Sequence, residues 1–179
     1  MRTKEHSNKI LLCVNSEFKR KIYPMDNFDH QILKIMQNNC RTSTEQMGAD
    51  IGLSATACQR RIKKLRELGI IEKEVAIVDS KALGGYVTIL VEVIVKRGGS
   101  DEIEKFKHAM LSHEEVQQCY YVTGNADFIL VITAQTMHEY EAITQRLFFS
   151  NDNIQKFHSN VVMDNVKVGL NIPIKALPY

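Results

Sequence analysis

Basic side chains cluster in one short segment of the chain, residues 54–68. The segment contains one acid, Glu67, against five basic residues, which are Arg60, Arg61, Lys63, Lys64 and Arg66. Cys58, Ile62 and Leu65 recur at steps of four and three, the spacing of the buried stripe of a helix. Small residues occupy the first turn. Such a helix can approach base edges in the DNA major groove with its N-terminal end, while its basic flanks neutralise phosphates.

The position of each residue along this helix suggests its chemical role. Residues near the N-terminal end lie closest to the bases, and we predict base contacts by Ser54, Thr56, Gln59 and Arg60. The remaining basic residues are predicted to contact phosphates, namely Arg61, Lys63, Lys64 and Arg66. The alternative is the solvated basic face of an ordinary helix. The preceding residues favour DNA, because Ser43 and Gln46 are spaced as a capping box and residues 52–53 as a tight turn between helices.

A second candidate site is the loop at residues 124–127, between two apolar segments. Asp127 is the only acid of this loop and could bind a ligand amine, while backbone N–H groups near Gly124 could bind a ligand carboxylate. We predict an effector site formed by Tyr121, Thr123, Gly124, Asn125, Ala126 and Asp127. The other interpretation is a plain hairpin turn, because Gly, Asn and Asp are favoured in turns for backbone reasons alone.

Residue types that serve catalysis or metal binding form no convergent pattern. The four cysteines make no C-x-x-C pair and stand at Cys13, Cys40, Cys58 and Cys119. His108 and His113 lack a third ligand at a suitable spacing. We therefore predict no metal site, no cofactor and no enzymatic activity. Scattered cysteines and the lack of a long apolar run predict a cytoplasmic protein without a membrane span.

The net charge of +2 is too small to indicate a nucleic-acid partner by itself, but the charge is unevenly distributed. Residues 1–80 carry 14 Lys or Arg against 10 Asp or Glu, whereas residues 81–179 carry 9 against 11. Within residues 25–80 the two signs balance at 8 each. The prediction of DNA binding therefore depends on the local cluster and not on bulk charge.

Three helices are predicted to position the basic segment. Apolar residues recur with the helical period, and the predicted helices span residues 26–38, 43–51 and 54–68. An alternating segment at 74–78 predicts a strand that leads out of this unit. Residues 1–24 have no clear period and are expected to form an extension outside the folded core. The predicted domains are a helix-turn-helix over 25–78, a linker over 79–85 and a second domain over 86–179.

The second domain has the period of β-strands. The predicted strands span 87–96, 116–123, 127–134 and 160–168, and the predicted helices span 101–111 and 137–148. Ser100 and Thr136 are expected to cap the two helices. The order βαββαβ predicts an α+β fold with a ferredoxin-like sheet, which leaves one face without helices. Because that face is rich in Ile, Val and Leu, we expect a second copy of the chain to cover it, forming a homodimer.

Three stretches resemble the leucine-responsive regulatory protein/AsnC (Lrp/AsnC) family. Residues 29–35 (DHQILKI) and 52–71 (GLSATACQRRIKKLRELGII) are similar to its helix-turn-helix, and residues 122–128 (VTGNADF) resemble the Gly-Asp-x-Asp hairpin of its amino-acid-sensing domain. The chain departs from the usual motif with Ala55 and Ala57 in place of prolines. It also has Asn125 where the family often has Asp, which removes one negative charge.

The resemblance covers residues 26–179 and implies a winged-type helix-turn-helix that binds double-stranded DNA. It also implies a dimer formed through the ferredoxin-like sheets, often four dimers in an octamer, and an amino acid or related effector bound between dimers. These are expectations carried by the family, not by the spacing of the residues.

The leading hypothesis is a DNA-binding transcriptional regulator that responds to an amino acid or a related small molecule. A ligand-independent architectural DNA-binding protein is the alternative, and weak sequence preference would favour it. An RNA-binding sheet would need exposed aromatic and basic residues, but residues 127–133 contain one aromatic residue and no basic one. An enzyme with a regulatory domain is disfavoured because the first 80 residues offer no catalytic set.

Overall fold

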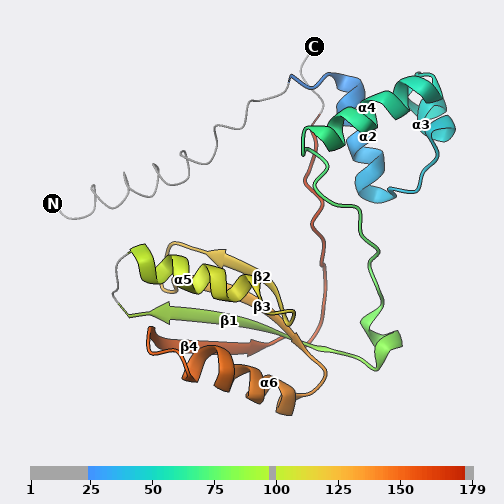
Figure 1. The fold of residues 1–179 in the computed structure, drawn as a ribbon. Coiled ribbons are helices and arrows are strands. Elements are labelled where there is room, and N and C mark those ends of the chain that lie inside the picture. Colours follow the sequence, from blue (N-terminus) through green and yellow to red (C-terminus); the bar gives the residue numbers. More distant parts are fainter. Residues whose placement is uncertain (1–23, 97–99, 176–179) are drawn as a thin grey trace. The chain divides into compact units, whose positions relative to one another are not determined.

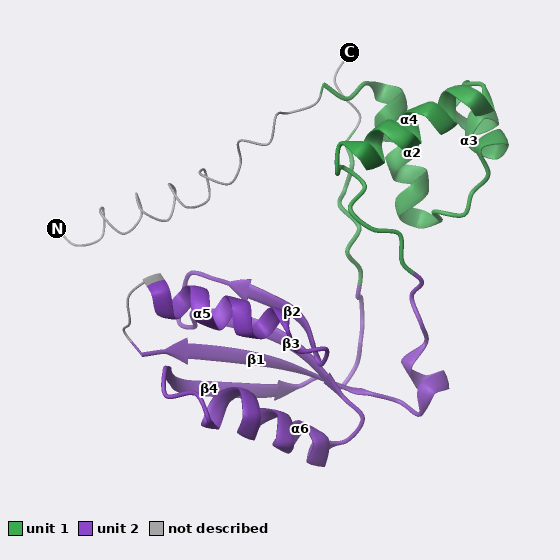
Figure 2. Ribbon diagram, viewed as in Figure 1, with its two compact units in different colours: residues 1–75, 169–179 green, residues 76–168 purple. Residues whose placement is uncertain are grey.

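The structure is a computed structural model that describes residues 24–96 and 100–175 (Figure 1). The predicted extension at residues 1–24 lies outside this range except for Pro24, and the side chain of the predicted cap Ser100 is not described either. The chain forms two compact units (Figure 2). The first ends at Val75 and includes the C-terminal residues from Gly169 onward, and the second runs from Ala76 to Val168.

The first unit contains the three predicted helices, each begun by a side-chain cap. They are α2 (Asn27–Asn38), α3 (Thr44–Ile51) and α4 (Ala55–Glu67). The Asp26 carboxylate accepts a hydrogen bond from the backbone N–H of Asp29, and the Asp29 carboxylate accepts one from the backbone N–H of Asp26. The Ser43 and Ser54 hydroxyl groups cap α3 and α4. These caps satisfy backbone donors that a helix leaves unpaired, which explains why the helices begin where they do.

One side of each helix packs into a small common core. Its buried members are Ile32, Met36, Met47, Cys58, Ile62 and Leu65. The turn between α3 and α4 is tight, because a Cβ atom added to Gly48 would lie 2.3 Å from the carbonyl oxygen of Leu53. Gly52 ends α3 with a left-handed backbone, φ 77°, a conformation that glycine adopts at little cost. The turn thus fixes α3 and α4 close together as a helix-turn-helix.

The strand predicted at residues 74–78 does not form. These residues are extended but have no strand partner among the described residues, and the side chain of Ile77 is 96% exposed. No β-strand wing therefore accompanies α4 in the described part of the chain. Alternating apolar residues suit a strand only when a neighbouring strand supplies backbone hydrogen bonds.

The C-terminal tail belongs with the first unit and not with the second. The Gln37 side-chain amide at the end of α2 donates to the carbonyl oxygen of Ile172 at 3.0 Å and accepts from its backbone N–H at 2.7 Å. This differs from the predicted domain division, which assigned all residues from 86 to 179 to one domain. The chain thus leaves the first unit near Val75 and returns to it at Gly169.

The second unit has the predicted order βαββαβ. Its elements are β1 (Val87–Val95), α5 (Ser100–Leu111), β2 (Val116–Tyr121), β3 (Phe128–Ala134), α6 (Met137–Thr144) and β4 (Ile154–Val161). The strands form one antiparallel sheet in the order β2-β3-β1-β4. A short 3-10 helix, Ser80–Leu83, precedes the sheet. The ferredoxin-like α+β fold predicted from the sequence is confirmed.

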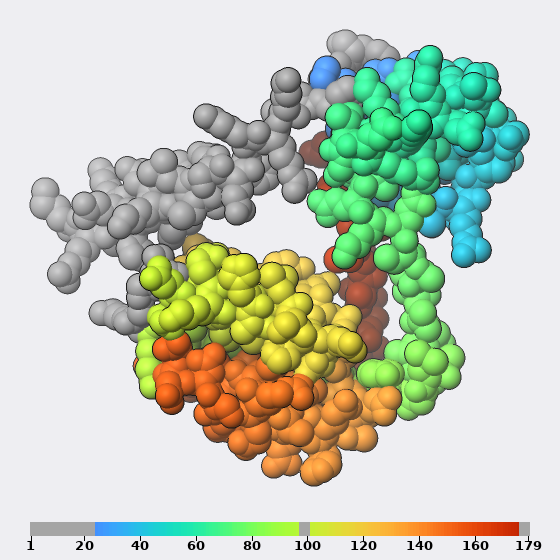
Figure 3. Space-filling view, in the orientation of Figure 1, coloured from blue at the N-terminus to red at the C-terminus, as the bar shows by residue number. Residues whose placement is uncertain are grey.

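Both helices of this unit cover the same face of the sheet (Figures 1 and 3). Alternate residues of β1 and β3 point into the core, and Phe106, Tyr140 and Leu147 close it from the helix side. The inward strand residues are Ile89, Val91, Val93, Phe128, Leu130, Ile132 and Ala134. The residues between them, such as Leu90 and Val131, lie on the face that the helices leave uncovered.

The last strand lies earlier than predicted. It spans 154–161 and pairs with β1, with Phe157 opposite Val93, whereas the sequence predicted 160–168. Apolar and polar residues alternate more regularly in residues 162–168, but their side chains are exposed apart from Val162. The position of the last strand is therefore determined by pairing with β1 and not by the local sequence pattern. The helix predicted to reach residue 148 ends as α-helix at Thr144 and continues as a π-helix, Gln145–Phe149. Within the described residues, no helix has the length and apolar character needed to span a membrane.

Candidate functional site

Helix α4 presents one buried side and one exposed side. Cys58, Ile62 and Leu65 are buried in the core of the first unit. Seven of the predicted DNA-contact residues are exposed, namely Ser54, Thr56, Gln59, Arg60, Lys63, Lys64 and Arg66. Because successive residues of a helix are separated by about 100°, Thr56, Arg60 and Lys63 form a single row along the side opposite the core. A row of this kind can enter a groove of DNA along its length.

Neighbouring acids engage two basic residues of this helix to different degrees. Lys63 Nζ lies 3.8 Å from Glu67 Oε1, and both side chains are largely exposed, so water weakens this pair. Arg66 Nη2 lies 2.6 Å from Glu74 Oε1 in the segment that follows the helix. The phosphate contact predicted for Arg66 would compete with that ion pair, so Arg66 is a weaker candidate than Lys63.

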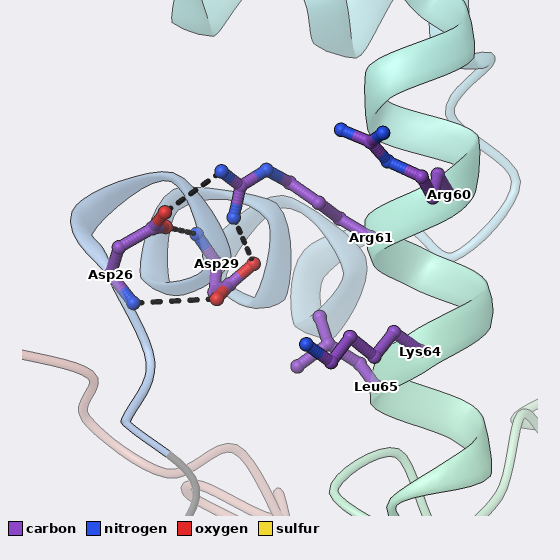
Figure 4. A pocket seen from close by; sticks show the side chains of 6 residues that line it. All are labelled: Asp26, Asp29, Arg60, Arg61, Lys64 and Leu65. Carbon is purple, nitrogen blue, oxygen red and sulfur yellow. Dashed lines mark hydrogen bonds and ion pairs between the residues drawn. The ribbon is translucent and has the colours of Figure 1, made fainter.

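Arg61 is placed differently from the sequence prediction. Its guanidinium group points toward the N-terminus of α2 (Figure 4), where Nη2 lies 2.8 Å from Asp26 Oδ2 and Nη1 lies 2.7 Å from Asp29 Oδ1. The guanidinium carbon also lies 5.5 Å from the centroid of the Phe28 ring, within the range of a cation–π contact. The predicted phosphate contact by Arg61 would have to compete with these two ion pairs inside the unit.

The ion pairs around Arg61 shift the proton affinities of the groups involved. Hydrogen bonding to the Asp29 carboxylate raises the pKa of Arg61 above its ordinary value. Burial acts to raise the pKa of Asp26, but the hydrogen bonds from the Asp29 N–H and from Arg61 outweigh it and lower that pKa. Both groups therefore hold their charges more firmly than free side chains do.

The second candidate site is the loop between β2 and β3, and its acid is bound to the protein backbone. One carboxylate oxygen of Asp127, Oδ2, accepts a hydrogen bond from the N–H of Val95 in β1 at 2.9 Å. The N–H of Val122 donates to the Asp127 carbonyl oxygen at 2.9 Å and closes the loop. Gly124 is exposed with φ 134°, a backbone that disfavours other residues. Asp127 thus has a role in the fold whether or not a ligand binds.

Two residues of the predicted effector site, Tyr121 and Thr123, do not lie on one continuous strand. The β2 strand ends at Tyr121, so the alternation of faces does not extend to Thr123, which is exposed in the loop. The Tyr121 ring packs on the helix side of the sheet, with its centroid 5.1 Å from that of Phe128. The ammonium group of Lys107 in α5 lies 5.1 Å from the same ring.

Among the hollows of the described surface are two that are lined by no residue of the predicted effector site. One, of about 320 Å³, lies between α2 and α4 and is lined by Asp26, Asp29, Arg60, Arg61, Lys64 and Leu65 (Figure 4). The other, of about 510 Å³, lies beside α6 and β4 and is lined by Met137, His138, Tyr140, Glu141, Thr144, Phe157 and Ser159. The β2–β3 loop forms part of neither hollow.

Comparison with known proteins decides between the possible functions of this pair of units. The sequence model of the AsnC-type helix-turn-helix domain matches residues 25–66, and that of the Lrp/AsnC ligand binding domain matches residues 88–172. A helix-turn-helix transcriptional regulator of Sinorhizobium fredii is 46% identical over 151 residues, which cover 84% of this chain and 89% of the relative. The chain belongs to the Lrp/AsnC family of transcriptional regulators.

Further relatives of this Lrp/AsnC protein agree with that assignment. The leucine-responsive regulatory protein of Escherichia coli is 29% identical over 157 residues, covering 88% of this chain and 96% of the relative. The crystal structure of an AsnC family regulator from Agrobacterium tumefaciens superposes with a TM-score of 0.78 at 27% identity, covering 83% of this chain and 97% of that one. A Neisseria meningitidis regulator in complex with L-Met has the same fold, with a TM-score of 0.77 at 23% identity and coverage of 83% and 96%.

Family membership makes this protein a DNA-binding transcriptional regulator with a ligand-binding domain, and not an enzyme. Sequence reasoning did not identify Asp26 and Asp29 as partners of the basic helix. The signal was present, because Arg61 stands three residues after Cys58 and four before Leu65 and therefore lies at the edge of the buried stripe. Sequence reasoning also missed Gln37, because nothing in the sequence near Gln37 indicates its contact with the distant C-terminal tail.

Proposed function

We propose that this Lrp/AsnC protein is a sequence-specific regulator whose DNA binding changes when it binds an amino acid or a closely related metabolite. The proposal depends on the exposed row of residues on α4. The same chain also contains the family's ligand-binding domain. DNA affinity and ligand affinity are then linked reciprocally, because a ligand shifts an equilibrium only through different affinity for its states.

The proposed DNA contacts come from the exposed side of α4. Ser54, Thr56, Gln59 and Arg60 are proposed to contact bases, and Lys63 and Lys64 are proposed to contact phosphates. The support is exposure of all six side chains and the cap at Ser54, which leaves small residues at the end nearest the bases. Arg61 is left out of this set because its guanidinium group is paired with two carboxylates.

The uncovered sheet face supports a homodimer. Leu90, Ile129 and Val131 form an apolar centre on β1 and β3, and Tyr120 of β2 extends it. A single chain leaves this area in water, and a second copy that covers it would gain from burying apolar surface. We propose a homodimer through this face and an octamer of four such dimers.

The effector is proposed to bind at the β2–β3 loop, in a site completed by another copy of the chain. The L-Met complex of the Neisseria relative supports an amino acid as the class of ligand. Residues Tyr121, Thr123, Gly124, Asn125, Ala126 and Asp127 are the proposed contacts. A site completed by assembly agrees with the loop lying outside both hollows of the single chain.

One observation favours the alternative of an architectural DNA-binding protein without an effector. Asn125 provides no charge in the loop, and the Asp127 carboxylate is already bonded to Val95. A ligand amine therefore meets a weaker negative site than two free carboxylates would provide.

Fluorescence anisotropy on the DNA upstream of this protein's own gene tests both functions. Binding is measured at two salt concentrations, with and without a pool of the twenty common amino acids, against a scrambled duplex of equal length. We expect tight, salt-sensitive binding that prefers the upstream duplex and shifts with the pool. Equal affinity for both duplexes with no shift would favour the architectural alternative, and no binding to either would contradict DNA binding by this chain.

A further inference from the structure

The Arg61 side chain points in a different direction from that of the neighbouring basic residue Arg60. It stands next to Arg60 in the sequence, yet Arg60 is exposed whereas the Arg61 side chain is 26% exposed and faces α2. Its two terminal nitrogens bind one carboxylate each, Asp26 at 2.8 Å and Asp29 at 2.7 Å. A guanidinium group that binds two separate acids fixes both the rotation and the tilt of the helix that carries it more firmly than one contact does.

The two carboxylates are themselves held in place. Asp26 and Asp29 bond to each other's backbone N–H groups in the cap of α2, and the side chain of Asp29 is 5% exposed. Phe28 lies against the guanidinium group from the same turn. Arg61 therefore connects the middle of α4 to a turn of α2 whose two acids are held by reciprocal hydrogen bonds (Figure 4).

We propose that Arg61 is a positioning residue for DNA recognition, which sets the orientation of α4 through Asp26 and Asp29 and contacts no phosphate itself. This inference depends on the proposed DNA contacts of α4. Successive residues on a helix are about 100° apart, so a rotation that brought Arg61 toward a phosphate would turn Arg60 away from the bases. The ion pairs prevent that rotation and keep the exposed row in register with the groove.

The pairing has a second consequence for the surface around the recognition helix. Asp26 and Asp29 line the same hollow as Arg60 and Lys64. With Arg61 in place, one of their two negative charges is compensated. Without it, two uncompensated carboxylates would lie next to the surface that receives phosphates, and they would repel DNA of every sequence.

The test compares Arg61→Ala with Lys63→Ala, a matched exposed residue that is a proposed phosphate contact. Dissociation constants are measured for a duplex that the wild-type protein selects from a random pool and for a scrambled duplex, over a series of salt concentrations. Lys63→Ala should weaken binding to both duplexes by a similar factor and lower the salt slope by about 1. Arg61→Ala should lose at least about tenfold more affinity for the selected duplex than for the scrambled one. Because no phosphate contact disappears, any fall of the slope comes from the uncompensated carboxylates and should be reversed by adding Asp26→Asn.

Conservative variants separate positioning from general loss of structure. Arg61→Lys keeps a charge that can reach one acid, and it should restore part of the lost preference for the selected duplex. Adding Asp26→Asn to Arg61→Ala should raise affinity for both duplexes by removing repulsion, without restoring the preference. Circular dichroism and stoichiometric titration give the folded, active fraction of each variant, and if Arg61→Ala does not fold, Arg61→Lys carries the comparison.

Each contrary result has a distinct meaning. A salt slope that falls by about 1 in Arg61→Ala with the preference intact identifies a phosphate contact and overturns the positioning role. Unchanged affinity and preference overturn it as well. If the wild-type protein binds every duplex equally, sequence-specific function is contradicted but the positioning role is not. Arg61→Ala must then lower affinity for all duplexes, and adding Asp26→Asn must reverse any change of the salt slope. A wild-type protein that binds no DNA overturns both proposals.

Discussion

The exposed side of α4 and the β2–β3 loop are both candidate binding regions, but they differ in how much a single chain provides. On α4 the polar side chains face water, while the packing that holds them comes from the same unit. In the loop, the acid that would bind a ligand is bonded to Val95, and neither hollow includes the loop. Under the proposed function, one copy would present the DNA-contact residues of α4 by itself, whereas the effector site would be completed by another copy.

The largest effect is expected from Gly48→Ala, which tests whether the DNA surface depends only on its own unit. The new Cβ would clash with the Leu53 carbonyl oxygen at 2.3 Å and force α3 away from α4. We expect the first unit to lose about 1–3 kcal/mol of stability, as for other overpacked sites, and DNA binding to weaken with it. Thermal melting followed by DNA titration measures both.

The control for that variant is Ala49→Ser, which changes the adjacent exposed position and should alter stability by less than about 0.5 kcal/mol. Hydrogen exchange should show the sheet unit unchanged in Gly48→Ala. Loss of protection in β1 and β3 as well would show that the two units depend on each other for folding.

Arg60→Ala tests the DNA side of the comparison directly. If Arg60 pairs with a guanine, the variant should lose about 1–3 kcal/mol of binding free energy on the preferred sequence and less on random DNA. Anisotropy titration with both duplexes measures the difference. Lys34→Ala, which removes an exposed charge on α2, is the control and should leave the preference unchanged. Equal losses on both duplexes for Arg60→Ala would make Arg60 a phosphate contact.

Substitutions at Asp127 test the effector side. Asp127→Asn keeps an oxygen for the Val95 N–H but removes the charge, so the shift caused by the amino-acid pool should disappear while the fold is retained. Asp127→Ala also leaves that N–H unpaired and should cost about 1–3 kcal/mol of stability in addition. The reverse change, Asn125→Asp, adds a charge and should strengthen the shift. A shift that persists in Asp127→Asn would remove the carboxylate from the site.

The smallest effect concerns acid stability of the first unit. Because the pKa of Asp26 is lowered in the folded state, its contribution to stability is present above about pH 4, the unfolded value. It is lost as the pH falls through the lower, folded value. Asp26→Asn should therefore be less stable than the wild type near neutral pH and lose less stability below pH 4. The side chain is half exposed, so the difference should stay below about 1 kcal/mol. Chemical unfolding across this pH range measures it.

Prediction from the sequence succeeded where local chemistry determines the structure. The starts of α3 and α4 follow from Ser43 and Ser54, and the alternation in residues 128–134 identifies a strand packed under helices. The βαββαβ order followed from these local periods. The exposed side of α4 was likewise visible in the spacing of Cys58, Ile62 and Leu65.

Prediction failed where distant residues decide. Residues 74–78 and 163–168 belong to no strand in the described part of the chain, although their sequences predicted strands, whereas the more polar β4 pairs with β1. The role of Arg61 depends on acids more than thirty residues away, with a separation of 32 from Asp29. The cluster of basic residues predicted a phosphate contact for Arg61. Only the position of Arg61 at the edge of the buried stripe indicated a partner inside the unit.

The contact between Gln37 and Ile172 changes what kind of connection joins the two units. Since the chain leaves the first unit near Val75 and re-enters it at Gly169, the sheet unit is an insertion within the first unit, not a module attached at one end. A module on one tether can spin freely about it. An insertion is joined to the helices at both of its ends, so two connecting segments limit its rotation in place of one.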